Sequence, residues 1–174
     1  MTSTQLRGDA MNTKKLTYIA LLTALSLIIF IVELRLPTLA PIPGMKLGLA
    51  NIITVYAVYS LSAGETAMIL TARILLGAIF SGNAMALAYS FAGGLLCLLG
   101  MLLLKRVIDR DHIWVCSVLG AVLHNIGQTA AAAVLMQTGT VITYLPFLLV
   151  SGCIAGALTG MSAQLVVRRI DKKK

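Results

Sequence analysis

The chain has few charged residues for its length. Of its 174 residues only 11% are Asp, Glu, Lys or Arg, whereas 59% are hydrophobic. The mean hydropathy is +0.94. A soluble domain of this size needs more polar surface than such a composition supplies. The composition therefore excludes an ordinary soluble globular domain and predicts an integral membrane protein.

Cysteine and acidic residues are also scarce, which limits the chemistry. Cys97, Cys116 and Cys153 lie far apart and form no CxxC motif. The nearest acidic pair, Asp109 and Asp111, is too small for the metal cluster that ionises an allylic diphosphate. The sequence also lacks a P-loop and a convincing catalytic triad or dyad. We therefore predict no catalytic residue, no metal and no cofactor, and we interpret the cysteines as packing residues.

Six apolar segments with short connections occupy nearly all of the chain. Each has roughly the length that a helix needs to cross a bilayer, although the second and third are short. The sequence therefore predicts an all-α, compact six-helix membrane domain over residues 14–168. A flexible tail (1–13) precedes it and a basic tail (169–174) follows. The predicted spans are Leu16–Leu34, Leu47–Leu61, Thr66–Phe80, Ala84–Leu104, Ile113–Met136 and Tyr144–Val167.

The basic residues predict the orientation of the helices. Most of the 14 Lys and Arg residues flank the apolar segments, so we assign the net charge of +8 to membrane topology and expect no nucleic-acid partner. With the N-terminus inside, only Arg35 and Lys46 lie outside, and Arg73 lies within a span. The positive-inside rule then predicts both termini on the cytoplasmic side of a bacterial-type plasma membrane.

Polar side chains within the spans predict a binding pocket. Such side chains are costly in hydrocarbon, so each needs a reason. They come from four spans and lie between the midplane and the outer surface, whereas the inner half has no comparable set. This asymmetry favours an outward pocket with a closed base over a through-channel. The set comprises Asn51, Arg73, Tyr89, His124, Asn125 and Gln128.

Each member of this set has a second interpretation. Arg73 could pair with a ligand carboxylate or phosphate, or it could snorkel or pair internally, with Glu33 the only nearby acid. His124 and Gln128 are four residues apart and share a helix face, where they could bind a ligand or join helices by hydrogen bonds.

The connection PIPGMKLGLAN, residues 41–51, places Lys46 between the first two spans. Its prolines and glycines favour a shaped turn over a floppy linker. We interpret it as the lid and rim of the pocket, with a snorkelled lysine in a simple turn as the alternative.

Small residues indicate close helix contacts. Gly152, Gly156 and Gly160 form a double GxxxG pattern in the last span. In the first span Ala20 and Ala24 are four residues apart and leave a shallow groove for another helix, either a partner's or one inside the bundle.

Three stretches, PGMKLGLANI, ARILLGAIFSG and YSFAGGLL, resemble a family of small six-helix membrane proteins. It is called Gx transporter or heptaprenyl diphosphate synthase component I, and the resemblance covers about residues 14–168. That family is similar in turn to the substrate-binding S components of energy-coupling factor (ECF) transporters. S components bind vitamins or precursors in an outward pocket beneath a lid. Their AxxxA motif docks on a transmembrane coupling subunit driven by two ATPase subunits, which implies that Ala20 and Ala24 are the docking pair.

The sequence supports three hypotheses for function. The first is the substrate-binding subunit of an ECF-type transporter for a small metabolite that is anionic or carries phosphate. Lys46 and Arg73 would supply positive charge, and the other polar residues would orient the ligand. The second is a noncatalytic membrane subunit that anchors a soluble polyprenyl or heptaprenyl diphosphate synthase. The third is a stand-alone carrier.

Overall fold

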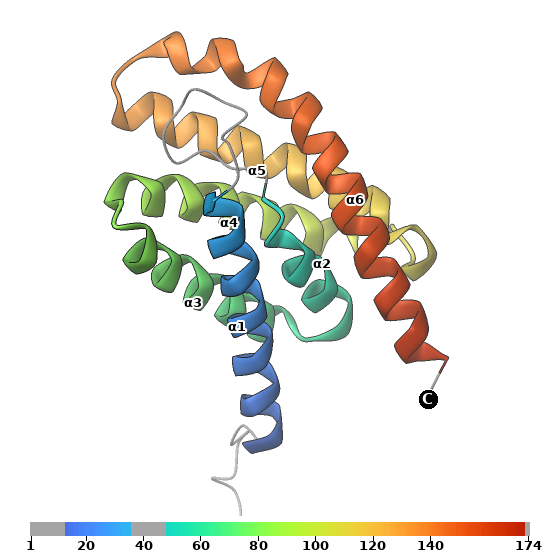
Figure 1. Cartoon of the computed structure of the whole chain (residues 1–174). Coiled ribbons are helices and arrows are strands. Elements are labelled where there is room, and N and C mark those ends of the chain that lie inside the picture. The colour runs from blue at the N-terminus through green and yellow to red at the C-terminus, as the bar shows by residue number, and fades with distance from the viewer. Residues whose placement is uncertain (1–12, 36–47, 173–174) are drawn as a thin grey trace, which may run out of the picture.

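Every regular element in the computed structural model, which describes residues 13–35 and 48–172, is a helix. The described residues form six α-helices and two short 3-10 helices, and Figure 1 labels the α-helices. The prediction of an all-α chain is confirmed over these residues. The elements are α1 (Thr13–Arg35), α2 (Asn51–Ser60), α3 (Ala63–Ser81), α4 (Ala84–Leu104), η1 (Arg110–His112), α5 (Ile113–Leu135), η2 (Gly139–Tyr144) and α6 (Leu145–Asp171).

Five of the described helices are long and apolar enough to cross a membrane. They are α1, α3, α4, α5 and α6, and their ends lie within four residues of the predicted ones. Within the described part of the second predicted span (Leu47–Leu61), residues 48–61, the α-helix covers only the ten residues of α2. At about 1.5 Å per residue α2 rises ~15 Å, half of a hydrocarbon core of ~30 Å. Among the described residues, α2 therefore does not cross the membrane by itself.

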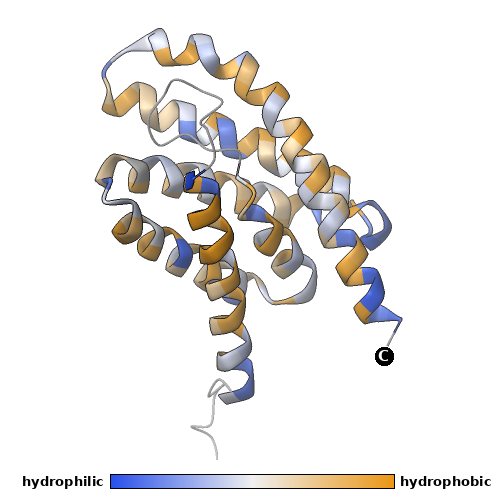
Figure 2. Cartoon of the chain, viewed as in Figure 1, coloured by the Kyte–Doolittle hydropathy of each residue, from blue (hydrophilic) through white to orange (hydrophobic). Residues whose placement is uncertain are grey.

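The outer faces of the helices carry large apolar side chains. Ile79, Val134 and Val150 are 74%, 76% and 64% exposed, and Figure 2 shows that hydrophobic residues recur along the length of the long helices. A soluble monomer rarely exposes so much continuous apolar surface, whereas a bilayer covers it. The structure is therefore that of a multi-pass membrane protein.

Glycines allow α6 to lie very close to α5. A Cβ added to Gly156 would lie 2.9 Å from the Cβ of Ala121 and 2.9 Å from the Cα of Val118. Gly152 and Gly160 meet α5 in the same way. The structure thus confirms that the double GxxxG pattern serves close helix contact.

The C-terminal end of α2 is bound by two cations. Lys105 lies between α4 and η1, and Arg110 lies in η1. The Nζ of Lys105 donates a hydrogen bond of 2.5 Å to the carbonyl of Val58. The Nη2 of Arg110 donates one of 3.2 Å to the carbonyl of Tyr59, and its Nη1 pairs with Asp171 of α6 at 3.0 Å. The last carbonyls of a helix have no partner within the helix and carry partial negative charge. These cations therefore satisfy and stabilise the end of α2.

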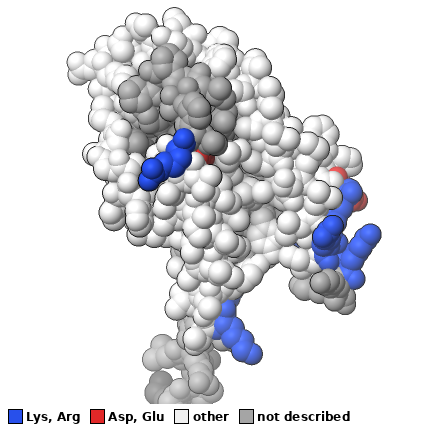
Figure 3. Space-filling model, viewed as in Figure 1, with Lys and Arg blue, Asp and Glu red and all other residues white. Residues whose placement is uncertain are grey.

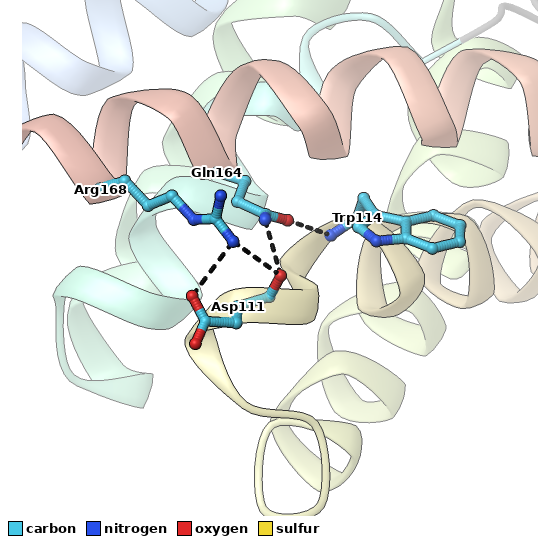
Figure 4. A network of polar contacts seen from close by, with 4 residues as sticks. All are labelled: Asp111, Trp114, Gln164 and Arg168. Atoms are coloured by element: carbon cyan, nitrogen blue, oxygen red, sulfur yellow. Dashed lines mark hydrogen bonds and ion pairs between the residues drawn. The ribbon is translucent and has the colours of Figure 1, made fainter.

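A second polar network joins the same end of the bundle to α6. The side chain of Gln164, on α6, bonds to both η1 and α5 (Figure 4). Its Nε2 donates to the carbonyl of Asp111 at 2.6 Å, and its Oε1 accepts from the N–H of Trp114 at 3.4 Å. Arg168 donates to the Asp111 carboxylate at 3.1 Å. Figure 3 shows cations near the C-terminal end of α6, at the start of α1 and at the last turn of α1, which contains Arg35.

At the start of α3, Ser62 and Glu65 form a capping box, in which each side chain bonds to the backbone of the other residue. Lys15 of α1 makes an ion pair with the same glutamate. The beginnings of α1 and α3 are therefore tied together.

We expect Gly156→Ala to lower the midpoint of thermal unfolding in detergent. The new methyl group must push α6 away from the backbone of α5, at a cost of about 1–3 kcal/mol. Gly64→Ala is the matched control, because a Cβ there meets nothing within 4 Å. Equal midpoints for the two variants would show that the α5–α6 contact tolerates a methyl group.

Candidate functional site

A small polar hollow lies between α1, the start of α2, α3, α4 and α5. It has room for little more than a water molecule. Four of the predicted pocket residues line it: Asn51, Arg73, His124 and Gln128. The remaining lining residues are Phe30, Glu33, Gly48 and Ser90.

The guanidinium of Arg73 is a buried cation that lines the hollow. The side chain is 6% exposed and borders a second hollow, which shares Phe30 and Ser90 with the first. Within residues 13–35 and 48–172, no ion pair within 4.0 Å and no side-chain hydrogen bond holds it. Glu33 is the carboxylate that acts on it electrostatically. A buried charge without a close partner is costly, which favours a role in binding an anion.

Glu33 ties α1 to the start of α2. Its carboxylate is 6% exposed and accepts the N–H of Gly48 at 2.6 Å, and the N–H groups of Leu49 and Ala50 act on it as well. A carboxylate at this position satisfies free N–H groups and suits the positive end of the α2 dipole. Sequence reasoning considered Glu33 only as a partner for Arg73 and missed this position.

Gly48 allows the chain to turn into α2 beside the hollow. Its φ of +79° lies in the left-handed region that favours glycine. A Cβ there would also come 2.9 Å from the Nδ2 of Asn51. The glycine therefore allows Asn51, the first residue of α2, to reach the hollow.

His124 and Gln128 reach the hollow from one face of α5, where Gly93 brings α4 close to them. A Cβ on Gly93 would lie 2.6 Å from the Cγ of Gln128 and 2.7 Å from the carbonyl oxygen of His124. Both α5 side chains are buried, at 5% and 4% exposure. The Nδ1 of His124 has no hydrogen-bond partner in the described part of the chain.

Two predicted members of the pocket lie elsewhere. Asn125 donates a 2.6 Å hydrogen bond to the carbonyl of Leu148, so it joins α5 to α6. This follows because Asn125 is about 100° around the helix from His124. Tyr89 is fully buried with Ala132 and Leu148, while the next residue along α4, Ser90, lines the hollow.

Lys46 lies outside the described residues. Among the residues that are described, no group of three or more His, Cys, Asp or Glu side chains could hold a metal ion. The three cysteines are free thiols.

The predicted docking pair lies on the outside of α1. Ala20 and Ala24 are both exposed, while Thr23 between them is buried and donates to the carbonyl of Ile19 at 2.9 Å. Leu16, one turn earlier, is 48% exposed. The small residues thus leave a shallow depression on an accessible apolar helix face.

Asn125→Ala should destabilise the protein without changing the side chains that line the hollow. Loss of the bond to Leu148 should cost about 1 kcal/mol and lower the midpoint of thermal unfolding. Ser162→Ala is the control, because the Ser162 hydroxyl bonds within its own exposed helical turn and its removal should change little. If Asn125→Ala keeps full stability but loses a molecule that co-purifies with the native protein, Asn125 belongs to the binding site.

The comparisons with known proteins give one match. The heptaprenyl diphosphate synthase component I family matches residues 22–166, which include every residue that lines the hollow. Searches of curated proteins and of solved structures found no match. The family match confirms the resemblance seen in the sequence and extends over most of the chain. The chain therefore belongs to the heptaprenyl diphosphate synthase component I family.

Proposed function

We propose that this chain is the substrate-binding membrane subunit of an ECF-type, ATP-driven transporter in a bacterial-type plasma membrane. Its ligand is a small metabolite that carries an acidic or phosphate group, such as a vitamin or a vitamin precursor. The observation that carries this proposal is Arg73. Its buried cation has no close partner in the described residues and shares a hollow with polar side chains from four other helices.

The chemistry of the hollow suits recognition of an acidic group. A guanidinium has five N–H donors and can bind carboxylate or phosphate through two parallel hydrogen bonds. Asn51, His124 and Gln128 would orient the rest of the ligand. Tyr89 and Asn125 would act indirectly, through the packing of α5, and Lys46 stays a predicted residue of the rim.

A metabolite needs more space than the hollow has in this structure. Helices α1 and α2 are the natural elements to move, because α2 is short and its start is joined to α1 through Glu33. Binding energy from Arg73 would offset the cost of opening.

The partners in this proposal are a transmembrane coupling subunit and two ATPase subunits. The exposed pair Ala20 and Ala24 on α1 would contact the coupling subunit. To couple the partner to the hollow, α1 must contact the partner with one face and line the hollow with another. Phe30 and Glu33 line the hollow from the same helix, so α1 meets this requirement.

The family name favours a second candidate function, a membrane subunit that partners a soluble heptaprenyl diphosphate synthase. Component I proteins are generally noncatalytic. In the described residues the acidic side chains are scattered and form no metal-binding group. Under this alternative the synthase subunit would supply catalysis, and the chain would supply the attachment to the membrane.

We expect Arg73→Gln to lower the occupancy of a metabolite that co-purifies with the native protein by about 10- to 100-fold. This is the range for losing charge-assisted hydrogen bonds. Native mass spectrometry of protein purified from its own cells measures occupancy, and Arg106→Gln, at an exposed position, is the control. Unchanged occupancy in the Arg73 variant would refute an anion site at Arg73.

Replacing Ala20 and Ala24 together by Trp should prevent recovery of the coupling subunit when the chain is purified from its own cells, because bulky side chains fill the groove. The control is Ile154→Trp with Leu158→Trp, an exposed pair four residues apart on α6. Coupling and ATPase subunits recovered equally with both double variants would place the docking surface elsewhere. Recovery of a soluble prenyl synthase would support the alternative function instead.

A further inference from the structure

We propose that the hollow selects a zwitterion, a ligand whose acidic group pairs with Arg73 and whose positively charged nitrogen pairs with Glu33. This inference rests on the proposed function and narrows its substrate class from acidic metabolites in general to those that also carry an amino group or a similar cation.

The described lining of the hollow contains one basic and one acidic side chain of opposite sign. These are the guanidinium of Arg73 and the carboxylate of Glu33. Both side chains are 94% buried, since each is 6% exposed. Buried charges need opposite charges nearby. The described lining of the hollow therefore has one positive and one negative side chain, and a ligand of zero net charge preserves that balance.

Arg73 and Glu33 do not form an ion pair with each other in the described structure. They influence one another electrostatically, but no ion pair within 4.0 Å joins them in the described structure. They line the same space from different helices, α1 and α3. A ligand with both signs of charge can sit between them and contact both.

Both Arg73 and Glu33 keep hydrogen-bonding capacity that a ligand could use. The five N–H donors of Arg73 make no hydrogen bond in the described residues. The Glu33 carboxylate accepts the N–H of Gly48 and faces two further N–H groups. A carboxylate has about four acceptor positions, so it keeps one for a ligand nitrogen. The hollow thus offers donors on one side and an acceptor on the other.

The same charges disfavour a phosphate or diphosphate ligand. Within the described lining, two or more negative charges would meet a single arginine while facing the Glu33 carboxylate in a narrow site. Like charges in such a site repel strongly. Asn51, Ser90 and Gln128 are uncharged and cannot compensate for the excess negative charge.

Pairs of small probes that differ only in an amino group test this inference. We would measure binding of glycine and acetate, β-alanine and propionate, and γ-aminobutyrate and butyrate to the purified full chain, with inorganic phosphate as a further probe. In at least one pair the amino acid should bind about tenfold more tightly than its partner, the worth of one charge-assisted hydrogen bond. Equal or weaker binding of all the amino acids, tighter binding of phosphate, or no binding by any probe would overturn the inference.

Variants separate this inference from the proposed function. Glu33→Gln keeps an oxygen that can accept the N–H of Gly48, and it should abolish the preference for the amino acid while leaving the simple carboxylate bound. Arg73→Gln should abolish binding of both members of the pair. If the native chain prefers phosphate and Arg73→Gln no longer binds it, the proposed anion site at Arg73 is supported and the inference of a zwitterionic ligand is wrong. If binding of every probe is unchanged in Arg73→Gln, the proposed function fails too. Should Glu33→Gln not fold, the comparison of probe pairs on the native chain still decides.

Discussion

Hydrocarbon offers no partner for a charged side chain, and this constraint explains how the middle of the bundle is built. Arg73 lies buried on α3, a helix that is otherwise apolar enough to cross a membrane. In such surroundings a guanidinium must be met by polar groups of the protein or of a ligand. Four other elements accordingly bring polar atoms to the hollow, namely α1, the start of α2, α4 and α5. None of them makes a close ion pair with Arg73 in the described structure, and the proposal of an acidic ligand rests on this observation.

The short helix α2 depends on charges from other elements at both of its ends. Glu33 meets its free N–H groups, and Lys105 and Arg110 meet its last carbonyls. Each charge has the sign that the helix dipole favours at that end. A helix of ten residues is marginal by itself, and these contacts set where it begins and ends. Because α2 begins at the hollow, the same contacts also place Asn51 there.

The family name and the hollow lead to different ideas about function. The name refers to a synthase that makes a prenyl diphosphate, a ligand with several negative charges and a long apolar chain. The hollow instead combines one cation with one anion and several neutral polar side chains. A membrane subunit that partners a synthase need not bind the diphosphate itself, so both ideas agree with membership of the family. They differ in whether the hollow has a ligand of its own.

The sequence by itself determined the membrane class and the positions of the long helices. The lengths of the apolar runs locate α1, α3, α4, α5 and α6 to within a few residues, because a helix must satisfy its own backbone in hydrocarbon. Helical spacing also placed His124 and Gln128 on one face of α5. It could not tell which neighbouring helix each face of α5 meets, and so it grouped Asn125 with them.

Only the tertiary structure decided which polar residues meet. Asn125 faces α6 and Ser90 takes the place expected for Tyr89, since the close approach at Gly93 and Gly152 sets how α4, α5 and α6 are rotated. The limits of α2 and the position of Glu33 likewise depend on contacts between residues far apart in the chain. The period of a helix determines which residues share a face, whereas the partner of that face depends on how the helices pack.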